Sequence, residues 1–469
     1  MSQHLNFLNS FIHLIGKRRS NKKVPNPDNI IELCHQLVSK NSEATLFSLA
    51  KIILEGFNTL TEEQKKSFFF QLLDQFSVDR LKLKKALAEL NIDDEEQLRT
   101  LHKLIEPKSQ ELLRRLNQVP NGTSVLLKMR ESLLESTKNS PELRSLDADF
   151  VHLFRSWFNR GFLRLERIDW STSAQVLEKI MQYEAVHDIS DWGDLQNRVA
   201  AADKRLYAFF HPALPNEPLI FIEVALMNET PNSIMPILDR GVEPIDPQSA
   251  TTATFYSISN CQMGLKNVSF GSFLIKQVAS EIEQEFKQIK KFVTLSPVPG
   301  LKKWVNKTNL LDDIELPENI IEDIKECFEN TTPNQLALTR LTYYYLTQVK
   351  RKNGHAINPV AHFHLGNGAS LYEIHTEANP EFMGVVFTMI QITSGNPIAA
   401  QQQYISQTKR LGVPVFNTMF RENKTIFADA PRNGMPVVLN SYSNNTHSDI
   451  VGEIEEFAGE FSDKLEGGA

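Results

Sequence analysis

The chain has 469 residues, enough for about three domains of ordinary size. Hydrophobic residues make up 41% and charged residues 23%, a balance that excludes a chain disordered throughout. Acidic side chains outnumber basic ones, 57 against 50, so the composition gives no electrostatic sign of a nucleic-acid-binding protein. The sequence contains no run of about 18 apolar residues, so we expect no membrane span.

The cysteines and the N-terminus bear on the compartment. Cys34, Cys261 and Cys327 are far apart in sequence and form no CxxC pair, so neither a zinc site nor a disulfide framework is expected. A reducing compartment follows, and we predict the cytoplasm. Residues 1–27 contain no acidic side chain, and five basic residues follow the apolar stretch 7–15. This pattern fits an amphipathic first helix, with a mitochondrial presequence, and hence the mitochondrial matrix, as the alternative.

The first part of the chain has helical periodicity. Apolar residues recur at intervals of three and four from Asn29 to about Leu134, and again from Asp147 to Gly161, where the glycine is a candidate C-cap. Thr61 followed by Gln64 is a capping-box pattern at a helix start. We therefore predict an all-helical domain over residues 1–190. Since it carries no cluster of candidate catalytic residues, it is expected to serve as a scaffold or an oligomerisation domain.

The second part, residues 191–469, has a different residue pattern. Short runs rich in aromatic and β-branched residues predict strands at 205–210, 218–226, 251–259 and 291–295. A helical pattern lies between the last two of these, within 268–292, so this half is predicted to be a mixed α/β domain. The acidic tail from Ser448 to Glu466 also has helical spacing, and we expect a surface or docking helix there.

The segment between the third predicted strand and the helix is a candidate anion site. Glycine backbone and free amides at a helix N-terminus can bind phosphate, with hydroxyls from Ser269 and Ser272 as further donors or simple caps. The spacing matches neither GxGxxG nor the Walker motif, which disfavours a dinucleotide or nucleoside-triphosphate fold. The alternative is structural, with Gly264 turning the chain and Gly271 allowing close helix packing.

Two further segments carry candidate catalytic residues. Ser296 ends a predicted strand, where ligands of α/β sheets bind, although an ordinary Ser-Pro turn is the alternative. His362 and His364 alternate within what we predict to be a strand, which would put them on one face. No third ligand lies nearby, so we expect no metal there, and a proton-transfer histidine competes with a structural one. The chain has no GxSxG elbow.

Several of these segments belong to an ordered set of motifs. The set comprises WFNRGFLRLER at 157–167, YEAVH at 183–187, FFHP at 209–212, ATFYSIS at 253–259, the loop 264–272, SPVPG at 296–300 and FHLGNGA at 363–369. In order and spacing the set resembles the malonyl-CoA decarboxylase family over about residues 154–369.

The resemblance implies a fold, a site and a reaction. The fold class is α+β, a helical N-terminal domain followed by a catalytic domain related to the GCN5-type acetyltransferases. Ser296 and His364 take the positions of the catalytic serine and histidine, and His362 stands where other members often carry an arginine. The segment expected to bind the coenzyme A part of malonyl-CoA consists of Lys266, Asn267, Val268, Ser269, Phe270, Gly271 and Ser272.

The implied reaction is that of a carboxy-lyase, malonyl-CoA to acetyl-CoA and carbon dioxide. It uses no metal and no organic cofactor, because coenzyme A enters as part of the substrate. The partners implied are malonyl-CoA and acetyl-CoA, together with further copies of this chain through the helical domain.

One segment departs from the family. After FHLGNGA, family members continue with a stretch like GLMVNYLY, whereas residues 383–390 here read MGVVFTMI, with Thr388 and Met389 in place of the asparagine and tyrosine. Residues 390–469 resemble no part of the family. Two alternatives therefore stay open, a catalytically impaired acyl-CoA-binding protein and a coenzyme A-dependent acyltransferase of the same fold. The acyltransferase would need a pocket for an acceptor amine, and the sequence contains no dedicated one.

Overall fold

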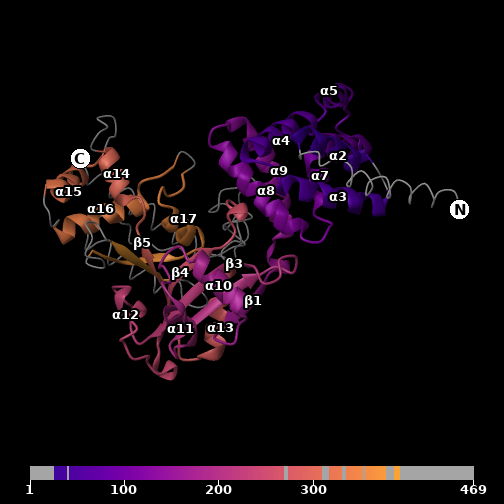
Figure 1. The fold of residues 1–469 in the computed structure, drawn as a ribbon. Helices are drawn as coiled ribbons and strands as arrows, with labels where there is room; N and C mark the ends of the chain where they lie inside the picture. The colour runs from indigo at the N-terminus through magenta and orange to yellow at the C-terminus, as the bar shows by residue number, and fades with distance from the viewer. Residues whose placement is uncertain are drawn as a thin grey trace, which may run out of the picture.

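The computed structural model describes residues 26–39, 42–268, 273–308, 316–329, 334–351, 354–376 and 385–390. In this range a helical part comes first and a part built on one sheet follows (Figure 1). The predicted tail helix at 448–466 and the amphipathic N-terminal segment lie outside the described residues.

The helical part begins with a bundle whose helices match the predicted periodicity. Its helices are α2 (Pro27–Ser39), α3 (Glu43–Asn58), α4 (Glu62–Gln75), α5 (Arg80–Ala88), α6 (Glu95–Ile105), α7 (Lys108–Leu116), α8 (Gly122–Thr137) and α9 (Arg144–Trp157). The capping box of α4 is confirmed, because Thr61 Oγ1 accepts from the Gln64 amide and Gln64 Oε1 accepts from the Thr61 amide. The predicted C-cap at Gly161 is wrong. Helix α9 ends at Trp157, and Asn159 starts a new turn by accepting from the Gly161 amide.

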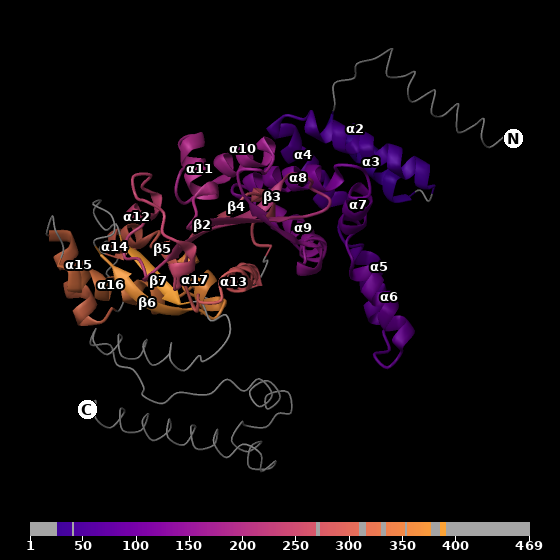
Figure 2. The same ribbon diagram turned by 90° about the horizontal axis from the view of Figure 1, so that it is seen from below.

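Two helices stand apart from this bundle. The hairpin of α5 and α6 has no buried residue on either helix. Figure 2 shows it extending away from the other helices. Its Leu81 and Ile92 side chains are 83% and 72% exposed, so these two apolar residues face solvent.

The core of the bundle reaches into the second part of the chain. It is rich in phenylalanine, with Phe57, Phe68 and Phe150 fully buried. Four residues from beyond the bundle are buried in the same cluster, namely Leu214, Leu219, Leu265 and Val268. The helical part and the sheet part therefore share one hydrophobic core.

Seven strands of the described residues form one sheet in the order β1-β2-β3-β4-β5-β7-β6. They are β1 (Arg164–Ile168), β2 (Lys204–Phe210), β3 (Pro218–Met227), β4 (Thr252–Asn260), β5 (Lys291–Pro297), β6 (Ser370–His375) and β7 (Val386–Ile390). The four strands predicted from the sequence are confirmed as β2 to β5, and the helix between the last two as α13 (Phe273–Glu285). Neighbouring strands are antiparallel except β4 and β5, which are parallel.

Helices cover both faces of this sheet. Helix α13 packs on the apolar side chains of β2 to β4, and α10 (Ala174–Tyr183) and α11 (Trp192–Ala200) cover the opposite face. The later helices are α12 (Met235–Leu238), α14 (Leu301–Thr308), α15 (Glu318–Glu329), α16 (Gln335–Thr347) and α17 (Pro359–Gly366). Of these, α14 to α17 pack with β6 and β7. The predicted fold class is confirmed as α+β, a helical part followed by a mixed α/β part, and its relation to the acetyltransferases stays a prediction.

The division between the two parts falls early in the chain. Strand β1 pairs with β2 over its whole length, and α10 packs on the sheet. Residues 164–183 therefore lie with the sheet, which is earlier than the boundary at residue 190 that the sequence predicts.

The pairing of β4 with β5 is short, and this creates the opening used by the site. The two strands pair from Thr252 with Lys291 to Phe255 with Thr294, and no later residues of the two are paired. Directly after Phe255 the register of β4 against β3 shifts, at a β-bulge. Beyond this point β4 and β5 diverge, which leaves room between them for a cavity.

Candidate active site

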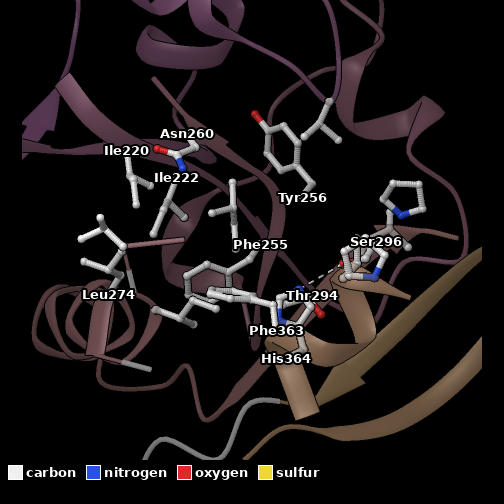
Figure 3. A pocket seen from close by; sticks show the side chains of 18 residues that line it. Ile220, Ile222, Phe255, Tyr256, Asn260, Leu274, Thr294, Ser296, Phe363 and His364 are labelled. Carbon is white, nitrogen blue, oxygen red and sulfur yellow. Dashed lines mark hydrogen bonds between the residues drawn. The ribbon is translucent and has the colours of Figure 1, made fainter. Parts of the chain in front are cut away.

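A cavity of about 540 Å³ lies where β4 and β5 diverge (Figure 3). This volume is within the range of small-molecule sites. Most of its wall is apolar, with contributions from β3 (Ile220, Ile222), β4 (Phe255, Ile258) and α13 (Leu274, Ile275). Its polar side chains are Thr294 and Ser296 from β5, His364 from α17, and Tyr256 and Asn260 from β4.

The structure brings the two predicted catalytic residues together. Ser296 and His364 are 68 residues apart in sequence, yet Ser296 Oγ lies 3.5 Å from His364 Nε2. Both side chains are buried, with 7% and 3% of their surface exposed. Figure 3 shows the pair at one end of the cavity. A hydroxyl and an imidazole at this separation can share a hydrogen bond and exchange a proton with a bound substrate.

The strand predicted for the two histidines is wrong, because residues 359–366 form helix α17. Side chains two positions apart on a helix point to different sides of it. His364 accordingly enters the cavity, whereas His362 packs against His355, with ring centroids 4.6 Å apart and the ring planes tilted by 48°. The sequence did contain a helix signal that we missed, an Asn-Pro pair typical of an N-cap followed by the first helical residue. Within the described residues, no group of three or more His, Cys, Asp or Glu side chains is placed to hold a metal ion.

The N-cap of α17 also fixes the distance between the catalytic candidates. Asn358 Oδ1 accepts from the Ala361 amide at 2.8 Å and so caps the helix. Its Nδ2 donates to the Pro299 carbonyl at 2.9 Å, in the turn that follows Ser296. One buried side chain thereby ties the helix that carries His364 to the strand end that carries Ser296.

Burial sets the charge of the histidine. The pKa of His364 falls from its ordinary value of 6.5 to about 4, because the apolar surroundings disfavour the imidazolium ion. The imidazole is therefore neutral near pH 7 when the cavity holds no substrate. A negative charge brought next to it would raise this pKa again.

The predicted coenzyme A segment starts at the cavity wall. Lys266 and Asn267 are exposed, and Asn267 adopts a left-handed conformation with φ of 65°, which asparagine tolerates better than most residues. Val268 is buried and lines the cavity. The rest of the segment, Ser269, Phe270, Gly271 and Ser272, lies outside the described residues.

Helix α8 of the helical part holds the start of this segment. Arg130 is fully buried, and its Nη1 donates to the Gly264 carbonyl at 2.6 Å while its Nε donates to Asp147 Oδ1 at 2.7 Å. Glu131 Oε1 accepts from the Gly264 amide at 3.1 Å. This contact could not be predicted from the sequence, because Arg130 and Gly264 are 134 residues apart and the first part of the chain contains no cluster of candidate catalytic residues.

A second buried polar cluster lies next to the cavity, and it was not predicted from the sequence either. Glu184 accepts hydrogen bonds from the hydroxyls of Ser257 at 2.8 Å and Ser259 at 2.9 Å. It also accepts from the amides of Val186 and His187, and Val186 lines the cavity. A signal was available, because serines at alternate positions of an otherwise apolar strand indicate a polar partner across that face.

Next to this cluster lies a buried ion pair. Arg198 Nη1 donates to Glu223 Oε2 at 3.2 Å and to the His187 carbonyl at 2.8 Å. Burial raises the pKa of Glu223, and the neighbouring Arg198 guanidinium works in the other direction by stabilising the carboxylate. Together Glu184 and Arg198 fix residues 184–188 against the sheet.

The segment that departs from the family lies beside β5. Met389 is fully buried on β7, in register with Thr294. Thr388 Oγ1 lies 3.3 Å from His375 Nε2. No phenol comes from position 389, so the polar groups of the cavity near β5 are Thr294, Ser296 and His364.

Fold and site together define a two-domain α+β protein with a serine–histidine pair in an apolar cavity between parallel strands. The family model described as "Malonyl-CoA decarboxylase C-terminal domain" matches residues 161–385. The one described as "Malonyl-CoA decarboxylase N-terminal domain" matches residues 76–158. The chain belongs to the malonyl-CoA decarboxylase family.

Solved structures and curated relatives agree with this assignment. The chain is 41% identical to a malonyl-CoA decarboxylase from Rhodopseudomonas palustris, with a TM-score of 0.73 over 84% of this chain and 98% of that one. A malonyl-CoA decarboxylase structure from Agrobacterium vitis is 38% identical, with a TM-score of 0.71, and the match covers 81% of this chain and 96% of that one.

The curated relatives named "Malonyl-CoA decarboxylase, mitochondrial" match over a shorter span. The protein of the goose Anser anser anser is 35% identical over 302 residues, 57% of this chain and 60% of the relative. That of Mus musculus is 33% identical over 312 residues, 60% of this chain and 63% of the relative. The matched part therefore spans less than two thirds of the length of these relatives. Among the helices that the structure describes, none has both the length and the apolar character that a bilayer crossing needs.

Proposed function

We propose that this protein is a carboxy-lyase that converts malonyl-CoA to acetyl-CoA and carbon dioxide, without metal or organic cofactor. The observation that carries the proposal is the placement of Ser296 beside His364 in an apolar cavity whose wall continues to Val268. Membership of the family supports it. Coenzyme A would lie along Lys266 to Val268 and on through Ser269, Phe270, Gly271 and Ser272.

The decarboxylation of malonyl-CoA requires particular groups in the site. The bond between the carboxylate carbon and the α-carbon breaks, carbon dioxide leaves, and the electron pair passes into the thioester to form an enolate. The enolate then takes one proton on its α-carbon, so the reaction consumes one proton overall. Donors must therefore point to the thioester oxygen, and a proton source must lie within reach of the α-carbon.

We propose that His364 donates the proton to the α-carbon and that Ser296 binds the carboxylate. The negative charge of the malonyl carboxylate raises the pKa of His364 from its low value, so that the histidine takes up a proton as the substrate binds. The Ser296 hydroxyl donates to the carboxylate and holds its bond to the α-carbon in line with the carbonyl π system, an orientation effect. The apolar wall favours the uncharged carbon dioxide over the carboxylate.

The test is a chromatographic assay of purified protein with malonyl-CoA. We expect acetyl-CoA from the wild type and none from His364→Ala. His362→Ala is the matched control, because this histidine lies outside the cavity, and it should retain activity. Coenzyme A binding should survive in both variants. Binding without turnover in the wild type would favour the impaired acyl-CoA-binding protein, and release of coenzyme A from acetyl-CoA only when amines are added would favour the acyltransferase.

We also propose that the protein forms homo-oligomers through the helical domain. The exposed apolar residues of the α5–α6 hairpin support this choice of surface, with Leu81 83% and Leu87 52% exposed. Light scattering coupled to size-exclusion chromatography should give a multiple of the 53.4 kDa chain mass. The double variant Leu81→Lys, Leu87→Lys should shift it towards the monomer, and a wild-type monomer would refute the proposal.

For the compartment, we propose the cytoplasm, with the mitochondrial matrix as the alternative. Cys34, Cys261 and Cys327 are free and buried and form no disulfide with one another, which supports a reducing compartment. Fractionation of the source cells with an antibody to the protein would decide between the two.

A further inference from the structure

We infer that Thr294 contacts the substrate directly, as a hydrogen-bond donor to the thioester oxygen of the acyl group. The inference rests on the proposed function for the identity of the substrate. Thr294 is 1% exposed, and its Oγ1 is a buried oxygen that forms no hydrogen bond within the part of the chain that the structure describes.

The position of this hydroxyl links it to the catalytic candidates. Thr294 and Ser296 are two residues apart on β5, so their side chains leave the same face of the strand, about 7 Å apart along it. Both line the cavity, as does His364. Figure 3 shows the three side chains at the same end of the cavity.

The protein neighbours of Thr294 offer no suitable acceptor. On one side its register partner is Phe255 of β4, and on the other it is Met389 of β7. A phenyl ring and a thioether are at best weak acceptors. A buried hydroxyl without a partner is unfavourable and uncommon in native proteins. A ligand oxygen in the cavity would satisfy it.

The chemistry indicates which oxygen this is. The enolate that forms when carbon dioxide leaves carries its charge on the thioester oxygen, and a donor fixed in an apolar wall stabilises that charge more than it would in water. With the Ser296–His364 pair assigned to the carboxylate and the proton, the thioester oxygen is the substrate atom still in need of a donor. The Thr294 hydroxyl only donates a hydrogen bond and transfers no proton.

The first measurement is the turnover of Thr294→Val, which keeps the shape of the side chain and removes the hydroxyl. We expect kcat/KM for malonyl-CoA to fall on the order of 100-fold. Thermal stability should not fall, because the variant removes an unsatisfied buried oxygen. Thr294→Ser restores the donor and should recover most of the activity. Thr254→Val is the matched control, since Thr254 is also buried, its hydroxyl has no partner among the described residues, and it does not line the cavity. It should behave as the wild type.

The second measurement is binding by calorimetry in a His364→Ala background, where turnover is absent. Adding Thr294→Val should weaken malonyl-CoA binding by about threefold or more and leave free coenzyme A binding unchanged, because coenzyme A lacks the acyl oxygen.

Several results would overturn the inference. Wild-type kcat/KM in Thr294→Val would do so, as would an equal loss in Thr254→Val or equal losses of malonyl-CoA and coenzyme A affinity. A wild type without turnover would instead refute the proposed function, and the difference between the two binding experiments would still decide whether Thr294 contacts the acyl group.

Discussion

Gly264 joins the proposed coenzyme A segment to helix α8, and adding a single methyl group there tests how much this contact contributes to stability and substrate binding. A Cβ atom at Gly264 would lie 2.5 Å from the carbonyl oxygen of Leu127 and 2.9 Å from its carbonyl carbon. Both atoms belong to the backbone of a helix, so no side chain can move aside to make room. The variant Gly264→Ala must therefore push residues 263–265 away from α8.

The structure gives the size of the effect. Overpacking of this kind costs about 1–3 kcal/mol. The same displacement stretches the bonds of Gly264 to Arg130, at 2.6 Å, and to Glu131, at 3.1 Å. Weakening these two bonds adds roughly 1 kcal/mol each, for a total loss of about 3–5 kcal/mol in the free energy of unfolding. We expect KM for malonyl-CoA to rise more than kcat falls, because Ser296 and His364 are carried by β5 and α17, which the substitution does not contact.

Urea denaturation and steady-state kinetics of the same preparation are the assays. Gly56→Ala serves as the control, since its Cβ would meet only the Ile30 side chain, at 3.3 Å, and alanine is favoured inside a helix by about 0.5–1 kcal/mol. Wild-type stability and KM in Gly264→Ala would refute the reasoning. A large loss of kcat at unchanged KM would show that α8 supports the catalytic pair and not the substrate segment.

Three further predictions concern His364, Glu184 and Asn358. As the pH falls from 8 to 5, His364 becomes protonated in the unfolded chain, where its pKa has the ordinary value of 6.5. In the folded chain its pKa is about 4, so it stays mostly neutral over this interval. Over this interval the free energy of unfolding of the wild type, measured by urea denaturation, should therefore fall by about 2 kcal/mol more than that of His364→Gln. Equal decreases in the two proteins would contradict the low pKa of His364. Glu184→Ala leaves two serine hydroxyls and two amides without their acceptor, so we expect a loss of roughly 2–4 kcal/mol by the same method and a lower kcat/KM. Unchanged kinetics would show that residues 184–188 do not shape the cavity. Asn358→Ala removes the N-cap of α17 and should cost about 1 kcal/mol while lowering kcat, and a stability loss without any change in kcat would mean that the link to Pro299 does not position the histidine.

Local patterns in the sequence predicted most of the sheet. Strands β2 to β5 carry continuous aromatic and β-branched runs because they are buried on both faces, and such runs stand out from helical periodicity. Strand β1 was missed, since it is an edge strand of only five residues, three of which are charged. Helix α17 was missed because its eight residues are too few to separate a period of 3.6 from a period of 2.

Some residues of the site could likewise be predicted from the sequence, and others could not. Ser296 and His364 could be named in advance from the motifs around them, and the structure places them in contact. The hold of Arg130 on Gly264 depends on how two distant segments pack, and nothing in the local pattern of either segment indicates the other. Thr294 was not singled out either, because a threonine within a strand is ordinary until the lack of a partner for its hydroxyl is seen in three dimensions.

The shared core has a consequence for how the protein folds and how it can be divided. Leu214, Leu219, Leu265 and Val268 belong to the sheet half in sequence but are buried among residues of the helical bundle. A chain cut near residue 160 would expose these side chains on one fragment and leave a matching apolar hollow on the other. The two halves should therefore melt in a single cooperative transition, and neither is a module that could be exchanged for its counterpart from a distant relative without repacking that contact.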